Sequence, residues 1–406
     1  MNAASGIDQP PEGAVSSNNT SRRTFLKGAA LAGAAGLAAP LLASTSARAS
    51  TSLILGIQAP EPWEGSASNP TLNAPGTWHW KVPGAVGCRS YVDTVFSTPD
   101  GCPASFPGIT MVPDKTDLDV VNGPKVHVAT KVVASIRPDP RVLLNPNSQY
   151  QPMFDNHIKD MILDGATRAA NSQLDSGFGG RPKLTVWHEA GNLYTDPNGT
   201  DNKGVLWRTY GLVPGYPITI DGTTYGAAQL VRSMHVKMKN LCDQVKANHP
   251  ELSGYHVDYG CIIYGQIDQM ASDTDPDRNF VPNKGYPLDW YGIDVYYEDD
   301  PGWGRGNLVD YTAVSNYMNR WLVVAQERSG KASPTINVCE CNANASNADA
   351  RPGFFEHLAA WLFTYGGSSP HMLTFFPVGG GNHSVQWGPP QQSTIDALNF
   401  IQSTYG

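Results

Sequence analysis

Two stretches decide the fold, Leu184-Thr-Val-Trp-His-Glu189 and Thr335-Ile-Asn-Val-Cys-Glu340. Each is a short, largely apolar run of the kind that forms a buried strand, and each ends in a glutamate just before a loop that contains Asn. In parallel α/β folds, the functional side chains lie at the C-terminal ends of the strands. We therefore expect Glu189 and Glu340 to share one face of a parallel sheet.

The same alternation of strand, loop and helix continues on both sides of these stretches. Six further strands are expected near residues 53–57, 89–92, 125–136, 255–264, 290–296 and 372–376. Helices are expected near residues 154–177, 227–247, 310–329, 354–365 and 394–403. This pattern predicts an α/β protein, a single-domain (β/α)₈ TIM barrel with long loops on its catalytic face. The first two helices of such a barrel are not evident before residue 124.

Residues 1–49 have the composition of an export signal. Ser21-Arg-Arg-Thr-Phe-Leu-Lys27 precedes a small-apolar run over 28–42, and Ala47-Arg-Ala49 is a small-x-small cleavage site. Adjacent arginines before a weakly hydrophobic stretch are typical of a twin-arginine signal peptide. We expect residues 50–406 to be the secreted catalytic domain.

The net charge of the chain limits the kinds of molecule that it is expected to bind. The full chain carries a net charge of −8, and removal of residues 1–49 takes away four Lys/Arg and two Asp/Glu, which leaves −10. Such a surface disfavours nucleic acid and anionic lipid and suits a neutral substrate. No second apolar segment is long enough to span a membrane. We expect a soluble monomer with no nucleic-acid or membrane partner after signal cleavage.

The cysteines and the acidic residues do not have the spacing of a metal site. Cys88 and Cys102 flank a Pro/Gly loop and are the pair most suited to a disulfide. Strict alternation places Cys339 and Cys341 on the strand face opposite Glu340, where they would pack as small apolar groups. No CxxC zinc spacing occurs, and the acidic run 273–277 lacks the Gly and Glu of a calcium loop. We expect no metal and no cofactor.

A carboxylate pair at one pocket can perform glycoside hydrolysis. One carboxyl group must hold a proton near neutral pH, and the other must stay ionised. Retaining enzymes keep the two groups about 5–5.5 Å apart, and inverting ones about 6.5–9.5 Å apart.

The sequence resembles glycoside hydrolase clan A, whose acid/base ends strand four and whose nucleophile ends strand seven. Trp187-His188-Glu189 is similar to the His-Glu motif of family 26 mannanases, and Gly292-Ile-Asp294-Val-Tyr296 is similar to their strand-six motif. The resemblance implies a retaining reaction on β-glycosidic bonds, with Glu189 as acid/base, Glu340 as nucleophile and Tyr296 as the residue that orients it. The residues that follow both glutamates differ from the usual ones.

Other polar residues are candidates for the site. His188 is expected either to contact a sugar hydroxyl or to be a hydrogen-bonded core histidine. Arg89 either holds the nucleophile or forms an ordinary ion pair, and Asn192 is expected to face the substrate. Asp294 shares a strand face with Tyr296 and either lines the site or bonds a neighbouring strand, and of these two roles we favour the second.

Aromatic side chains in the loops provide stacking surfaces for sugar rings. Trp303, Phe376 and Trp387 follow predicted strands at the catalytic face, where their rings would pack on the apolar faces of a carbohydrate. Two alternatives remain. One is a secreted carbohydrate-binding barrel without catalytic activity, and the other is a different barrel hydrolase or lyase that uses Asp294 or a metal.

Overall fold

The protein is described by a computed structural model. Its described residues are 53–57, 82, 87–107, 132–171, 181–190, 202–297, 308, 310–343, 351–367, 371–375 and 392–406. All of them belong to one unit, Arg48–Gly406. The predicted signal peptide lies outside the described residues, and so do Asn192, Trp303, Phe376 and Trp387. Among the described helices, none is long and apolar enough to cross a lipid bilayer.

Eight parallel strands form one sheet in the order β1-β10-β9-β8-β7-β4-β3-β2. They are β1 (Leu53–Ile57), β2 (Cys88–Phe96), β3 (Val132–Pro138), β4 (Lys183–Val186), β7 (Asp258–Tyr264), β8 (Trp290–Tyr297), β9 (Ile336–Ala343) and β10 (His371–Phe375). A parallel bridge between Gly56 and Gly87 joins the two ends of the sheet, and Gly87 N donates to Leu55 O at 3.0 Å. The ring is therefore a barrel, and all eight predicted strands are confirmed.

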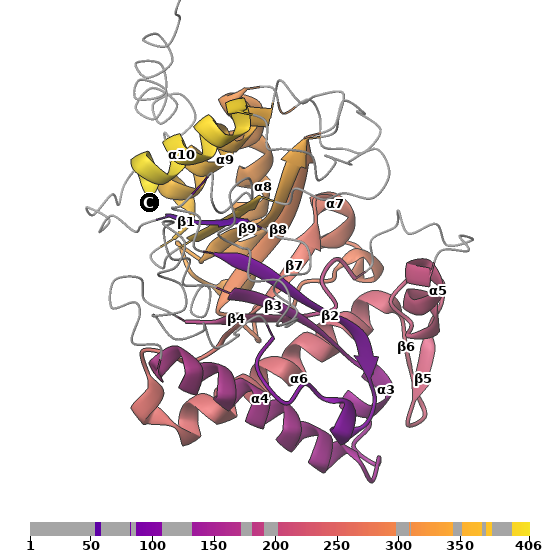
Figure 1. Ribbon diagram of the computed structural model, residues 1–406. Helices are drawn as coiled ribbons and strands as arrows, with labels where there is room; N and C mark the ends of the chain where they lie inside the picture. The colour runs from indigo at the N-terminus through magenta and orange to yellow at the C-terminus, as the bar shows by residue number, and fades with distance from the viewer. Residues whose placement is uncertain are drawn as a thin grey trace, which may run out of the picture. The chain divides into compact units, whose positions relative to one another are not determined.

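Helices pack around the outside of the barrel. They are α4 (Gln151–Asn171), α6 (Ala227–Asn248), α8 (Tyr311–Ser329), α9 (Arg351–Tyr365) and α10 (Gln392–Tyr405). In Figure 1, α4 and α6 lie on one side of the strands, and α8, α9 and α10 lie on the other. α8 ends at Gly330, whose φ of 67° gives the left-handed turn that stops many helices. The predicted (β/α)₈ fold is confirmed.

Smaller elements were not predicted. They are α3 (Pro140–Leu143), α5 (Asn202–Thr209), α7 (Ile267–Met270), the 3₁₀ turns η3 (Pro99–Gly101), η5 (Pro250–Leu252) and η6 (Pro276–Arg278), and the hairpin of β5 (Ile218–Ile220) with β6 (Thr223–Tyr225). The hairpin turns at Asp221-Gly222, where both residues have positive φ. Asp-Gly between two short β-prone runs is a strong hairpin signal, so the hairpin could have been predicted from the sequence.

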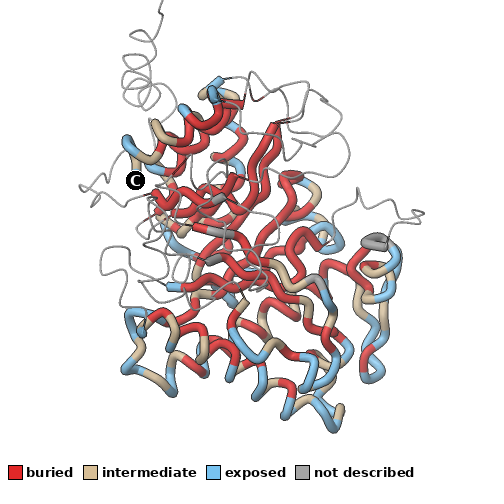
Figure 2. Tube along the Cα trace, in the orientation of Figure 1, coloured by how far each residue is buried: buried red, intermediate tan, exposed pale blue. Residues whose placement is uncertain are grey.

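The hydrophobic core has two parts, because each barrel strand has one face toward the helices and one toward the barrel interior. The larger cluster, which includes Leu184, Val186 and Ile293, lies between the strands and the helices. The smaller cluster comes from six different strands and fills the barrel interior; its members are Ile54, Val133, Ile262, Trp290, Cys339 and Met372. Figure 2 shows the strands buried, with exposure confined mainly to the outward faces of helices and to turns.

Glycines make room for Trp290 and Met372 in the barrel interior. A Cβ added at Gly260 would lie 2.2 Å from the Trp290 ring, and one at Gly56 or Gly87 would lie 2.8 or 2.9 Å from the end of Met372. Real Cβ atoms do not approach so closely, because interiors are packed to the density of organic crystals. Trp290 and Met372 therefore fit only against strands that lack side chains at these positions.

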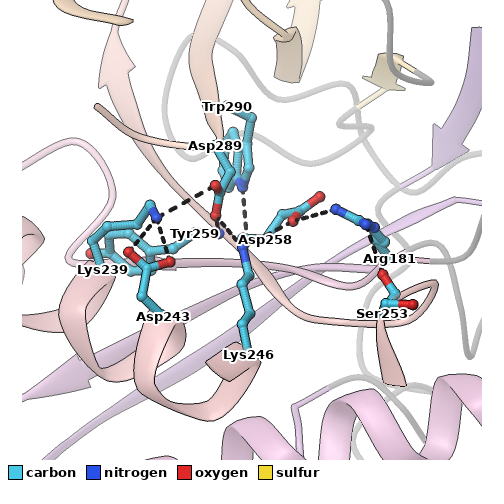
Figure 3. Close-up of polar contacts among 9 residues, drawn as sticks. All are labelled: Arg181, Lys239, Asp243, Lys246, Ser253, Asp258, Tyr259, Asp289 and Trp290. Carbon is cyan, nitrogen blue, oxygen red and sulfur yellow. Dashed lines mark hydrogen bonds and ion pairs between the residues drawn. The ribbon is translucent and has the colours of Figure 1, made fainter. Parts of the chain in front are cut away.

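Charged residues gather at the opposite end of the strands from the two glutamates (Figure 3). Lys246 Nζ lies 2.7 Å from Asp289 Oδ2 and 3.3 Å from Asp258 Oδ1, and Arg181 also pairs with Asp258. Asp258 begins β7 and Asp289 immediately precedes β8. Burial opposes the charge of Asp289, but Lys246 and Lys239 outweigh it and lower its pKa. This network ties α6 to the strand starts and is a structural feature.

The predicted disulfide is wrong. Cys102 is a free, buried thiol, and burial raises its pKa to about 12. It belongs to the apolar cluster that contains Phe96 and Phe106. Cys102 therefore packs as a small apolar group rather than as half of a cross-link.

Candidate active site

The chain turns sharply where β4 delivers Glu189. Trp187 and Glu189 have φ values of 43° and 57°, in the left-handed region that non-glycine residues rarely adopt. Neighbouring strands hold this turn, because Trp187 N donates to Ile136 O of β3 and Glu189 N donates to Ile262 O of β7. The Trp187 indole adds a hydrogen bond to Pro138 O at 2.8 Å. Strained backbone held in this way often marks a functional site.

A β-bulge aims Glu340 into the barrel. β8 pairs Ile293 with Val338 and then Asp294 with Glu340, so Cys339 is an extra residue in β9. A bulge interrupts the two-residue alternation of a strand. Cys339 consequently packs inside the barrel, next to the inward Glu340, whereas Cys341 joins the outer cluster. The expectation that both cysteines face away from Glu340 is therefore wrong for Cys339.

Three carboxylates converge at the C-terminal ends of β4, β8 and β9. One oxygen atom each from Glu189, Asp294 and Glu340 lies within 4.8 Å of the other two. Their exposed fractions are 6%, 0% and 5%. The structure thus brings together the two predicted glutamates and adds Asp294, which lines the site instead of serving only a neighbouring strand.

Two tyrosines donate hydrogen bonds to Glu340. The Tyr296 hydroxyl, on β8, donates to Oε2 at 2.6 Å, which is the contact that the family resemblance implied. The Tyr91 hydroxyl, on β2, donates to Oε1. Burial and the Glu340 carboxylate raise the pKa of both phenols well above the usual value. Both tyrosines therefore stay protonated and act as hydrogen-bond donors to the Glu340 carboxylate.

Arg89 lies beneath this pair and is completely buried. Its Nη1 donates to Val133 O at 3.3 Å, and its guanidinium lies 4.7 Å from the centre of the Tyr91 ring. Burial opposes its charge, but Tyr91, Cys339, Asp294 and Glu340 outweigh this and raise its pKa. Within the described residues, the hydrogen bond of Arg89 goes to the backbone rather than to Glu340. Its guanidinium is a buried positive charge among the carboxylates.

His188 immediately precedes Glu189 and packs against the ring of Tyr91. Its Nδ1 shares a hydrogen bond with Ser135 Oγ at 2.8 Å, and its ring centre is 4.8 Å from that of Tyr91. The side chain is buried, with 7% of its surface exposed. This matches the core, hydrogen-bonded alternative, although the residue also borders the site.

Metal-dependent chemistry and a reactive cysteine have less support in the geometry of this site. Among the described residues, Glu189, Asp294 and Glu340 are the one group of three possible ligands close enough together for a metal ion. An acidic cluster alone does not make a cation site. Burial raises the pKa of Cys339 well above its usual value, so its thiol stays neutral and unreactive.

The sequence did not indicate that Tyr91 and Ser135 lie at the site, and the role that it favoured for Asp294 differs from the position that the structure shows. Tyr91 was detectable in principle, because it lies two residues after Arg89 on a predicted strand and so shares its inward face. It also lies nearer the C-terminal end of the strand, where the chemistry is expected. Ser135 carries no comparable signal, since its role depends on a neighbouring strand.

The fold and site define a class, a closed (β/α)₈ barrel with buried acidic residues at the C-terminal ends of its strands. No protein-family model and no curated protein sequence matches the chain. Among solved structures, it is similar to the catalytic domain of a GH26 endo-β-1,4-mannanase from Bacillus sp. JAMB-750, with 12% identity, coverage of 87% of this chain and 86% of that one, and a TM-score of 0.43.

Two further solved structures give similar values. A modular GH26 endo-β-1,4-mannanase from Cellulomonas fimi shows 11% identity over 86% of this chain and 70% of that one, with a TM-score of 0.44. A GH5_18 protein from Bifidobacterium longum subsp. infantis shows 10% identity over 87% and 79%, with a TM-score of 0.49. The chain is thus similar to glycoside hydrolases of the clan that its motifs resemble. At these scores the likeness does not identify a substrate.

Proposed function

We propose that this protein is a secreted glycoside hydrolase that cleaves β-glycosidic bonds of a neutral poly- or oligosaccharide with retention of configuration. One observation carries the proposal. Glu189 and Glu340, from strands far apart in the chain, place buried carboxylate oxygens within 4.8 Å of each other. Two carboxyl groups this close can act on the same anomeric carbon.

The environments of the two glutamates support different roles. Glu340 accepts hydroxyl hydrogen bonds on both oxygens, which hold the carboxylate in one orientation and suit a nucleophile. Glu189 offers a carboxylate oxygen within 4.8 Å of those of Asp294 and Glu340, and neighbouring negative charges suit a group that has to hold a proton as the general acid. In the first step Glu340 attacks the anomeric carbon while Glu189 protonates the leaving oxygen. In the second step Glu189 takes a proton from a water molecule, whose oxygen attacks the anomeric carbon and breaks its bond to Glu340, so that the sugar is released.

The short separation supports retention rather than inversion. Inverting enzymes keep their carboxyl groups about 6.5–9.5 Å apart so that a water molecule fits between one of them and the sugar. One oxygen of Glu189 lies within 4.8 Å of one oxygen of Glu340, which supports the shorter spacing of retaining enzymes. Three carboxylates at the site also disfavour anionic sugars, which supports a neutral substrate.

The test is a glycan panel with matched variants. Wild type should release reducing ends from one class of β-linked glycan, and proton NMR should show the β-anomer first. Glu340→Ala should abolish this activity, whereas Glu327→Ala, on the outer surface of α8, should leave it unchanged. Glu189→Ala should lose about 10²–10⁴-fold on natural glycans but much less on substrates with an activated leaving group. Retained turnover by a folded Glu340→Ala protein would overturn the proposal.

A cation-dependent barrel hydrolase or lyase is the second candidate, because Asp294 completes a group of three close carboxylates. Treatment with a chelator distinguishes the cation-dependent reaction from the two-carboxylate reaction. The two-carboxylate reaction needs no ion, so EDTA should leave kcat/KM unchanged. A barrel that only binds carbohydrate would instead retain glycan affinity and form no product with any member of the panel.

A further inference from the structure

The two hydrogen bonds to Glu340 come from opposite parts of the barrel. Tyr296 belongs to β8, which pairs directly with β9. Tyr91 belongs to β2, and β1 and β10 separate that strand from β9 in the sheet. Each tyrosine serves a different oxygen of the carboxylate. The Glu340 carboxylate is therefore held by one residue on the adjacent strand β8 and by another on β2, across the barrel.

We propose that Tyr91 is a positioning residue that fixes the orientation of the Glu340 carboxylate for attack on the sugar. The inference rests on the proposed glycosidase function and adds a residue to it that neither the motifs nor the family resemblance indicated.

A carboxylate bonded through one oxygen can still rotate about its terminal torsion, which is broad. A second donor on the other oxygen fixes the plane of the group. Because charge-assisted hydrogen bonds are stronger than neutral ones, both donors hold the carboxylate firmly in that orientation. Nucleophilic attack requires an oriented lone pair close to the anomeric carbon, so this restraint acts on the chemical step.

Tyr91 is itself held in place on two sides. The Arg89 guanidinium lies 4.7 Å from its ring centre, and the His188 ring centre lies 4.8 Å away. Arg89 is completely buried and bonded to Val133 O, so it is a fixed support rather than a mobile surface cation. Arg89 thus affects Glu340 through the ring of Tyr91 and through its charge, and not through a direct hydrogen bond, which was one of the two alternatives that the sequence left open.

The kinetic test compares Tyr91→Phe, Tyr296→Phe and the double variant with wild type. Loss of one hydrogen bond to a charged group should reduce kcat about 10- to 100-fold, with little change in KM. Loss of activity through kcat rather than through KM is the signature of a group that orients the nucleophile, because substrate binding does not depend on this hydrogen bond. Tyr259→Phe is the control; it removes a buried hydroxyl that bonds His235 outside the barrel and should leave kcat unchanged.

A second measurement does not depend on turnover. In protein labelled at tyrosine Cζ, the ¹³C signals of Tyr91 and Tyr296 are assigned by their absence from the Phe variants. Glu340→Ala should shift both signals and leave that of Tyr259 in place. A shift of the Tyr296 signal alone, or a Tyr91→Phe enzyme with wild-type kinetics, would overturn the role of Tyr91. If wild type hydrolyses no glycan, the proposed function fails, while the NMR result still decides whether Tyr91 bonds Glu340.

Discussion

Glu340 faces the pocket because of the residue that precedes it. Cys339 is the extra residue of the bulge, and it places two consecutive side chains on the inner side of β9. The sequence places Glu189 and Glu340 at strand ends, since apolar runs that end in a charge are easy to recognise. It does not reveal the bulge, because Val-Cys-Glu-Cys lacks a glycine or any other local signal. Tyr91 was missed for a related reason: its importance depends on a partner on a distant strand.

At this scale we predict that Cys339 resists alkylation in the native protein. Its side chain is completely buried, and burial raises its pKa, so the reactive thiolate does not form. Peptide mass spectrometry after iodoacetamide treatment should find Cys339 unmodified under native conditions and fully modified in denaturant. Rapid native labelling would show that the bulge does not point this residue into the barrel.

The strands and most helices follow from hydrophobic periodicity alone. The predicted helices near 227–247 and 310–329 agree with α6 and α8 to within a residue or two at each end. Two of the elements that were not predicted, α5 and the β5–β6 hairpin, lie in the long insertion after β4. Short elements there have too few residues for a period to stand out, although Asp221-Gly222 marks the hairpin turn.

At the scale of one strand, we predict that Gly260→Ala destabilises the protein by at least about 1–3 kcal/mol, because overpacking a filled interior forces side chains and backbone to move. The new methyl group would lie 2.2 Å from the Trp290 ring. Gly254→Ala is the matched control, since nothing lies within 4 Å of its added Cβ. Urea denaturation should give the first variant a clearly lower free energy of unfolding and leave the second near wild type. Equal values would contradict the packing of Trp290 against β7.

For the whole molecule, the alternation of strands and helices was enough to predict the barrel, because few other folds bury eight parallel strands. What the pattern could not supply was the order of side chains inside the barrel. That order depends on register, and register depends on the bulge and on the glycines opposite Trp290 and Met372. The chemistry could be placed at the correct end of the barrel without these details, but the contacts within the site could not.

We also predict that His235 makes the fold sensitive to acid. His235 on α6 bonds the Tyr259 hydroxyl at 2.8 Å, and burial lowers its pKa from 6.5 to about 3. Between these two values the unfolded chain binds a proton that the folded protein does not. The free energy of unfolding therefore falls as pH decreases through this window, by about 1.4 kcal/mol per pH unit from this residue.

His235→Gln should remove that contribution. Urea denaturation at pH 7, 5.5 and 4.5 should show wild type losing more stability than the variant at each step. Parallel curves for the two proteins would mean that His235 gains its proton without loss of the native state.

The joint between β1 and β2 has a consequence for how the barrel opens. Within the described residues, every other neighbouring pair of barrel strands shares a ladder of at least two residue pairs, whereas Gly56 and Gly87 form a single bridge with Met372 packed against both. A breathing motion of the native state would begin at this seam, since separating one bridge costs less than separating a ladder. The amide of Gly87 should therefore exchange its hydrogen for deuterium sooner than the amides of β8 and β9, and the carboxylates on β4, β8 and β9 would keep their relative positions while the seam is open.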